Sequence, residues 1–483
     1  MGRVPRLTVR TRRVRPCLLL LVLIVLSGSA RAQDPPKHDH DIELLVADAY
    51  SAPPEFVSDA LIRISSLPKV DKVWRRELLD EAYMRAYGAP EQYRRTTTQQ
   101  IPPDSRQGAQ VFAYASALTR VTLQVRVVQL MAAVDRDRAR ELFEWIDLNL
   151  APGVCADPLV PAVDDYYATL GMLARTAYAR NRADALNFLE LYAWRAHLPS
   201  EMPAVARAIQ RFRSGSLEAA YFEGLFRLIL QGSSTDAPGF ASAAPDIVSR
   251  ITDLQIADTT LGLAGSSLMD SLRAYLIAQF KAPRCADNVT AALMPTTFNA
   301  ALRRAKADTD VSPLDAAAAR FQTVAGGATI DMYWQSFDAV RLHDAAVKLR
   351  GRGTVPLPLR VRQTAEWRNQ AEGLLTDIER WNGRSEPAER DYFYQKAVLF
   401  TWLLDLMPAS HVRSRALRAF VDFLRRTDTD VNQRMLWSAF VHRLLEMSRG
   451  PFRSEVLTAM EDTHQPVLWL YARLERLAPE RRP

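Results

Sequence analysis

The amino-acid sequence predicts an all-α protein made of stacked antiparallel helix pairs, as an irregular α-solenoid or helical array. Apolar residues recur at helical spacing along most of the 483-residue chain. Alternating β-branched runs bounded by turn residues, which are typical of strands, hardly occur. Short helical segments are joined by polar connections, and this favours helices that pack against their neighbours in sequence. No strict repeat of the tetratricopeptide, ankyrin or HEAT kind is present.

The first 32 residues have the three parts of a secretory signal peptide. Arginines make a basic head, residues 17–26 form an uninterrupted apolar run, and Ala30-Arg31-Ala32 provides a cleavage site before Gln33. The apolar run is too short to cross a hydrocarbon core of ~30 Å as a helix. We therefore expect an exported protein, periplasmic or extracellular, with residues 1–32 removed. The alternative is an uncleaved N-terminal anchor.

Removal of the signal peptide also removes the excess charge of the chain. The sequence has 62 basic and 55 acidic residues, and seven of the basic residues lie in the signal peptide, which contains no acid. The mature chain is therefore formally neutral, with 55 residues of each sign. Nucleic-acid binding depends on clustered basic side chains that release counterions, so we expect none. No later apolar run reaches the length of a membrane helix, and we expect no membrane span after cleavage.

The mature chain begins with a short polar segment and continues as a series of helices. Within the segment, His38-Asp39-His40-Asp41 offers metal-ligand side chains, but a solvated, disordered tail is the favoured interpretation because nothing fixes their geometry. Arg76 and Asp80 have the i, i+4 spacing of an exposed ion pair. Apolar stripes at helical spacing follow over residues 57–64, 74–82, 111–134, 138–148, 165–179, 183–197 and 217–230. Between the second and third stripes, residues 96–108 are predicted to be a polar loop.

The C-terminal third has the clearest helical faces. One face combines Val412, Ala416, Phe420 and Phe423. Arginines 413, 415 and 418 are expected on the opposite, solvent side with Asp422. The next segment repeats the pattern with Leu436, Phe440, Leu444 and Met447. Weak periodicity and a Gly-Gly pair make residues 306–330 a possible linker between an N-terminal helical array, 33–305, and a C-terminal helical region, 331–483.

These alanine-rich helices, with faces of large residues, resemble uncharacterised secreted bacterial all-helical proteins. The resemblance implies an α-solenoid-like fold and no particular activity, because it leads to no family of known function.

Two cysteines, Cys155 and Cys285, remain in the mature chain. Each follows Ala-Pro near the end of an apolar segment and begins a Cys-Ala-Asp sequence, which suggests related loops at one edge of the array. An even number of cysteines in an exported protein favours a disulfide. The alternative is two separate buried thiols. Two cysteines are too few for a metal site, and we predict neither a metal nor a cofactor.

Three aspartates precede aromatic residues at expected helix starts: Asp165, Asp331 and Asp391. Helical toroids that act on glycans use carboxylates beside aromatic platforms, so these are speculative catalytic carboxylates. The favoured interpretation is structural, because an acid in the first turn suits the helix dipole and aromatics fill the core. The calcium-loop-like residues 428–432 are better explained as a helix cap.

No catalytic motif stands out in the sequence. His-Glu-x-x-His, Gly-x-Ser-x-Gly and phosphate-binding glycine loops are absent. We therefore expect an exported binding or scaffolding protein whose partner is a protein or a glycan, and a non-enzyme is favoured. The alternative is an all-α enzyme, a helical toroid acting on glycans. A concave surface with two carboxylates within roughly 5–10 Å of each other would favour that alternative.

Overall fold

The computed structural model confirms the all-α prediction. Helices dominate the part of the chain that the structure describes, and strands contribute two short segments there. The described residues are 38–90, 95–97, 105–155, 157, 159–176, 181–212, 216–260, 267–282, 289–315, 334–351, 356–383, 391–427 and 434–477. The predicted signal peptide lies outside them.

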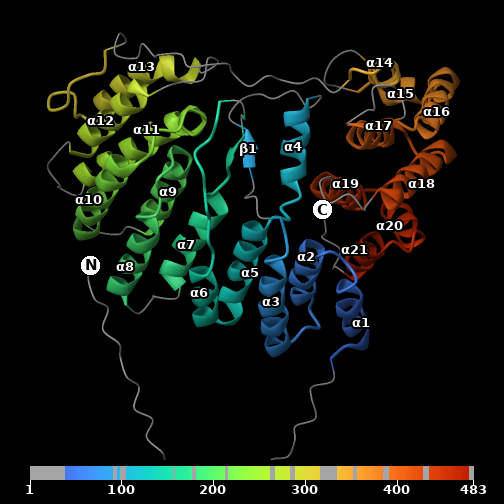
Figure 1. Ribbon diagram of the computed structural model, residues 1–483, viewed down its shortest axis with the longest axis horizontal. Helices are drawn as coiled ribbons and strands as arrows, with labels where there is room; N and C mark the ends of the chain where they lie inside the picture. Colours follow the sequence, from blue (N-terminus) through green and yellow to red (C-terminus); the bar gives the residue numbers. More distant parts are fainter. Residues whose placement is uncertain are drawn as a thin grey trace, which may run out of the picture.

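One arm of the molecule is a double row of helices from the N-terminal half (Figure 1). Its first row consists of α2 (Pro54–Ser65), α3 (Lys72–Ala86), α5 (Arg120–Val134), α7 (Asp164–Thr176), α9 (Met202–Phe212), α11 (Ala237–Thr260) and α13 (Val289–Arg304), each in contact with the next. A second set lies beside them: α6 (Arg136–Glu144), α8 (Arg182–Ala193), α10 (Ser216–Gly232) and α12 (Ser267–Lys281). A 3-10 turn, η1 (Pro199–Glu201), precedes α9.

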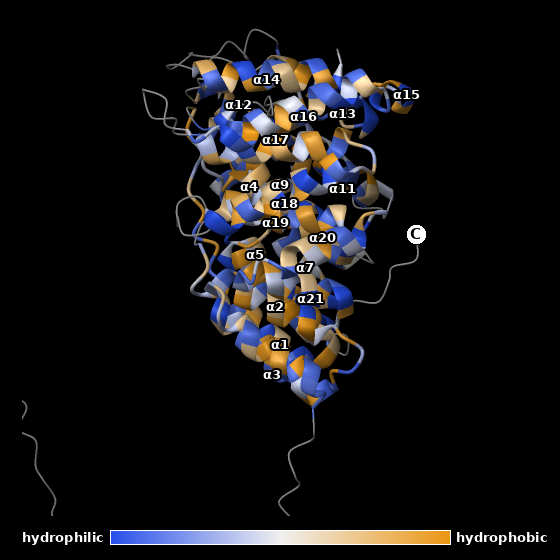
Figure 2. Cartoon of the chain, turned by 90° about the vertical axis from the view of Figure 1, so that its right-hand side faces the viewer, coloured by the Kyte–Doolittle hydropathy of each residue, from blue (hydrophilic) through white to orange (hydrophobic). Residues whose placement is uncertain are grey.

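The other arm comes from the C-terminal third. Its helices are α14 (Phe337–Arg350), α15 (Leu359–Arg362), α16 (Ala365–Arg380), α17 (Tyr392–Leu406), α18 (His411–Arg426), α19 (Arg434–Met447), α20 (Arg453–Glu461) and α21 (Pro466–Leu477). Figure 2 shows α14, α17, α18, α20 and α21 following one another from top to bottom, with α1 (His40–Ala49) below them.

The first and the last described helices meet where the arms join. Helix α21 packs against both α1 and α2, so helices far apart in sequence are neighbours in space. Between the arms lies α4 (Arg106–Ala115), which packs against α19 (Figure 1). In a regular solenoid each repeat contacts only its sequence neighbours. The arrangement therefore does not establish the predicted solenoid, although successive helices do pack side by side within each arm.

The segment predicted as a polar loop contains more structure than expected. Strand β1 (Arg95–Thr97) pairs antiparallel with β2 (Leu159–Pro161), and Thr96 lies opposite Val160. Helix α4 begins at Arg106, where Ser105 accepts a hydrogen bond from the backbone N–H of Gly108. The loop prediction was wrong there because a three-residue strand and a capped helix start leave little periodic signal.

One stretch of the described chain, Arg106–Val134, has the length and apolar character needed to cross a membrane. It comprises α4 and α5, and 56% of its most apolar window is buried within the fold. Core helices of water-soluble folds have the same character, so this stretch is weak evidence for a membrane span.

The predicted apolar stripes form the core. Val57, Leu61 and Ile64 are buried on α2, and Trp74, Leu78 and Ala82 are buried on α3. The helix ends follow the expected local rules: Pro54 begins α2, and the Asp71 carboxylate accepts from the backbone N–H groups of Val73 and Trp74 at the start of α3. The core is thus formed by the residues whose spacing predicted the helices.

Two predicted charge placements were wrong. Arg76 and Asp80 do not pair along α3. Arg76 pairs with Asp135 instead, and Asp80 accepts from Arg138 of α6 at 2.7 Å, because α6 lies against this face. Arg413 is buried rather than solvated. Its guanidinium lies 3.5 Å from the centre of the Phe452 ring and 3.2 Å from the Glu455 carboxylate.

The predicted division into two helical regions stays a prediction. Helix α13 ends at Arg304, α14 begins at Phe337, and most of the possible linker, 306–330, lies outside the described residues.

Candidate functional site

The speculative carboxylates are not brought together among the described residues. Asp165 is exposed in the first turn of α7, which contacts α5, α8 and α9. Asp391 precedes α17, which contacts α14, α16 and α18. Both carboxylate oxygens of Asp391 accept hydrogen bonds from the Arg106 guanidinium at 3.0–3.3 Å. Asp331 lies outside the described residues. The aromatic neighbours of the two described aspartates are largely buried, as the structural interpretation expects.

The structure describes one of the two cysteines that were predicted to form a disulfide. Cys155 lies in the turn that follows α6 and precedes β2, whereas Cys285 lies outside the described residues. The pairing of these two cysteines therefore stays a prediction.

The polar segment before α1 is ordered from His38 onward, contrary to the tail prediction. The His38 ring stacks on Trp74 with 4.0 Å between ring centres. Asp39 caps α1 through the backbone N–H of Asp41 and accepts from Lys69 at 2.6 Å. In the described part of the chain, no group of three or more histidine, cysteine, aspartate or glutamate side chains is placed to hold a metal ion.

A buried ionic cluster joins helices α2 and α5 to α21. Asp59 on α2 has a side chain with no exposed surface, and three groups converge on it. Arg63 donates from Nε at 2.8 Å, Arg126 of α5 lies at 2.7 Å, and the Tyr471 hydroxyl of α21 donates at 2.6 Å. Arg63 also pairs with Glu475 of α21 at 3.3 Å. The cluster therefore ties α2 and α5 to the last helix.

Burial and charge together set the protonation states in this cluster. Burial alone would raise the pKa of Asp59, but Arg63 and Arg126 outweigh it and hold that pKa well below its usual range. Burial lowers the pKa of His442, which contacts Arg63 from α19, to about 4. Asp59 is thus ionised and His442 neutral near pH 7. Because these groups mainly satisfy one another, the cluster is a structural connection.

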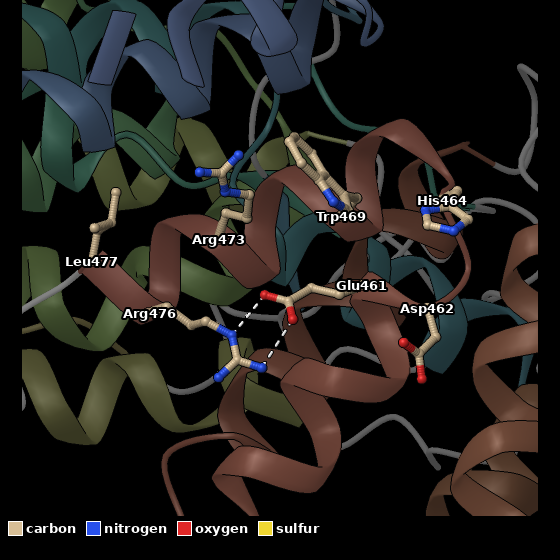
Figure 3. A pocket seen from close by; sticks show the side chains of 7 residues that line it. All are labelled: Glu461, Asp462, His464, Trp469, Arg473, Arg476 and Leu477. Atoms are coloured by element: carbon tan, nitrogen blue, oxygen red, sulfur yellow. Dashed lines mark hydrogen bonds and ion pairs between the residues drawn. The ribbon is translucent and has the colours of Figure 1, made fainter. Parts of the chain in front are cut away.

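A surface pocket of about 470 Å³ lies between α20 and α21. In Figure 3, Trp469 and Arg473 lie side by side, and the Arg473 guanidinium is 4.8 Å from the Trp469 ring centre. Arg476 makes two hydrogen bonds to Glu461, at 2.6 and 2.9 Å (Figure 3). The polar groups of this pocket are thus largely paired with each other or open to solvent.

A larger pocket of about 700 Å³ lies between α16, α17 and α18. Its volume is typical of small-ligand sites, which span about 300–1,000 Å³. Aromatic rings and cationic side chains provide most of its lining, which also includes Asn382, Ala419 and Thr427. The aromatic residues are Trp381, Tyr392, Phe400 and Phe423; the charged residues are Lys396, Arg415, Arg418 and Arg426 with Glu379 and Asp422.

Lys396 is the most unusual group in this pocket, because it is a buried ammonium with no carboxylate in ion-pair distance among the described residues. Nζ donates to the backbone oxygens of Trp381 at 2.5 Å and Glu379 at 3.4 Å, and to the Tyr392 hydroxyl at 3.0 Å. These carbonyls end α16, so Lys396 caps that helix where its dipole is negative. Burial, with a contribution from Arg426, lowers the pKa of Lys396 to about 8.

The other cations of the pocket differ in how far they are neutralised. Arg415 binds Glu379 and Arg426 binds Asp422, so both acids of the lining are already paired. Arg418 is exposed and makes no ion pair within the described part of the chain. The pocket therefore keeps an excess of positive charge beside an apolar surface. Such an arrangement can bind a ligand, but it presents no pair of unengaged carboxylates for hydrolysis.

Sequence reasoning did not identify this pocket. Tyr392, Lys396 and Phe400 recur every four residues along α17. Of these, only Tyr392 was considered, as one of the aromatic residues that follow Asp391. Arg415, Ala419 and Phe423 recur every four residues along α18. A lysine within an otherwise apolar helical stripe was the available signal, since lysine is rarely buried without a reason.

No protein-family model, curated protein or solved structure matches the chain.

Proposed function

We propose that this chain is an exported binding protein, and that its ligand site is the pocket between α16, α17 and α18. One observation carries the proposal: a cavity of about 700 Å³ combines aromatic rings, the buried Lys396 ammonium and Arg418, which makes no ion pair among the described residues. A few convergent polar groups on a mainly apolar lining are typical of small-molecule sites. Export rests on the signal-peptide pattern of residues 1–32.

Binding is favoured over glycan hydrolysis because of the state of the carboxylates. Glycoside hydrolysis needs two carboxyl groups on either side of the scissile bond, roughly 5–10 Å apart. In the pocket, Glu379 and Asp422 are each bound by an arginine, and Asp391 is engaged by Arg106. An all-α enzyme acting on glycans remains the alternative function, and Asp165 and Asp331 would then have to contribute.

The proposal is tested by native mass spectrometry of the mature protein, purified gently from the compartment to which it is exported. We expect a small molecule bound in a one-to-one ratio. Ala419→Leu, which adds bulk to the pocket wall, should remove it. Ala345→Leu is the matched control, because Ala345 is a similarly half-buried alanine on α14 outside the pocket.

The alternative is tested on the same preparations with a panel of glycans. Release of reducing ends by the wild-type protein, abolished in Asp165→Asn, would replace the binding proposal with the enzymatic one. Equal loss of the bound molecule in both alanine variants would show that the pocket does not hold it.

A further inference from the structure

We propose that the ligand of the α16–α18 pocket is an amphipathic organic anion, with an apolar body and one acidic head group. This inference rests on the proposed function of the pocket and adds the chemical class of the ligand. It follows from how the aromatic and cationic side chains are distributed around the cavity.

The aromatic part of the lining is packed against the core: Trp381, Phe400 and Phe423 are buried, and Tyr392 is half-buried. Phe400 and Phe423 belong to the core, and their ring centres are 6.0 Å apart. Trp381 and Tyr392 meet edge to face with ring centres 5.0 Å apart. Rings held by packing lose little freedom when an apolar group covers them, so they favour binding of a hydrophobic body.

The polar part of the lining is cationic and incompletely neutralised. Among its side chains, the acids Glu379 and Asp422 already accept from Arg415 and Arg426. Among the described residues, the hydrogen-bond acceptors of Lys396 Nζ are two backbone carbonyls and a hydroxyl. Lys396 can therefore act on a ligand mainly through its charge, whereas Arg418 is able to make a direct ion pair. A bound anion would offset the buried charge of Lys396, which nothing in the described lining offsets at ion-pair distance.

Both parts are needed to define the ligand class. An inorganic anion would use only the cationic side chains and would leave the aromatic walls of the cavity without a contact. A neutral apolar molecule would have to lie beside the unneutralised ammonium of Lys396, and it would not use Arg418. A carboxylate, sulfonate or phosphate monoester can pair with the positive charges of Lys396 and Arg418, while its apolar body packs against the aromatic walls of the cavity.

The test uses two fluorescent probes that share an apolar body and differ by one sulfonate group. They are 1-anilinonaphthalene-8-sulfonate and its neutral parent, N-phenyl-1-naphthylamine. We expect the anionic probe to bind the mature protein about tenfold more tightly than the neutral one, as a single charge-assisted contact allows. Arg418→Gln should remove most of this preference. Arg360→Gln, which removes an exposed charge on α15 outside the pocket, should leave it unchanged.

Competition experiments then distinguish an organic anion from a free inorganic anion as the ligand. Decanoate and indole-3-acetate should displace the anionic probe with aliphatic and aromatic bodies respectively, and inorganic phosphate at the same concentration should not. Displacement by either organic acid supports the proposal, whereas displacement by phosphate alone contradicts the need for an apolar body.

The Ala419→Leu variant separates an error in the ligand class from an error in the position of the binding site. Equal affinity for both probes, with both lost in Ala419→Leu, would overturn the anion class but keep the pocket as a binding site. Binding of both probes that is unaffected by Ala419→Leu would overturn the pocket itself. Circular dichroism of each variant confirms that the helical fold is retained.

Discussion

Replacement of Asp59 by asparagine should destabilise the protein strongly, because it removes the charge that joins α2 and α5 to α21. The carboxylate is fully buried, and it accepts from Arg63 at 2.8 Å and from Tyr471 at 2.6 Å, with Arg126 at 2.7 Å. Asparagine has nearly the same shape. The substitution therefore leaves two guanidinium groups without their anion and creates almost no cavity.

The size of the effect follows from the surroundings of the two arginines. Removal of one partner from a buried ion pair costs about 3–5 kcal/mol. Here Arg63 and Arg126 keep 26% and 31% of their side-chain surface exposed, so water can solvate part of the released charge. Arg63 also retains Glu475 at 3.3 Å. We therefore expect a loss near the lower end, about 3 kcal/mol in the free energy of unfolding.

The measurement is equilibrium unfolding in urea, followed by circular dichroism at pH 7. Asp377→Asn is the matched control, since Asp377 pairs with Arg341 at 2.7 Å but both side chains are more than 40% exposed. Exposed pairs contribute about 0–1 kcal/mol. A loss in Asp59→Asn no larger than that of the control would refute the claim that this cluster ties α21 to α2 and α5.

Other predictions concern pH, the cysteines and export. Because burial lowers the pKa of His442 to about 4, below the value of about 6.5 in an unfolded chain, the unfolded state binds more protons between these pH values. The free energy of unfolding should be at its maximum above pH 6.5 and should fall by up to about 3 kcal/mol as the pH drops toward 4. His442→Gln should flatten this pH dependence, measured by urea unfolding at each pH. The same pH dependence in wild type and variant would contradict the assignment to His442. Cys155 and Cys285 should be linked in non-reducing peptide maps, and Cys155→Ser should then cost about 2–5 kcal/mol in urea unfolding; two freely alkylated thiols in the native protein would refute the pairing. N-terminal sequencing of exported material should begin at Gln33, and an intact N-terminal methionine would contradict cleavage.

The helices were predictable because their signal is local. Val412, Ala416 and Phe420 recur at helical spacing, and all three are buried on α18. A period of 3.6 residues can be recognised in any window of one or two turns. The same argument explains why the all-α class could be predicted from sequence without knowledge of the arrangement of the arms.

The positions of charged residues were not predictable in this way, because they depend on contacts far along the chain. Asp59 accepts a hydrogen bond from Tyr471 of α21, 412 residues away, and the sequence around Asp59 does not predict this contact. Arg413 was placed in solvent from its helical face, but α20 brings Phe452 and Glu455 against it. Sequence periodicity locates the apolar face of a helix, and only packing decides whether a second face is covered.

The candidate site was missed for a related reason. Lys396 lies in an apolar stretch that predicts a core helix, and its role depends on the carbonyls that end α16. Of the three α18 arginines assigned to a polar face, Arg415 and Arg418 lie there and Arg413 is buried. This polar face borders a cavity with aromatic walls only because α16, α17 and α18 pack together, and the sequence of α18 alone does not show it.

Hydrogen exchange with mass spectrometry tests the central claim, binding in the α16–α18 pocket, most directly. The protein without residues 1–32 is compared with and without saturating 1-anilinonaphthalene-8-sulfonate. The account predicts slower exchange in peptides from the end of α16, from α17 and from α18, and unchanged exchange in α20 and α21. Protection centred on the α20–α21 pocket, or no protection in α16–α18 despite bound probe, would contradict it.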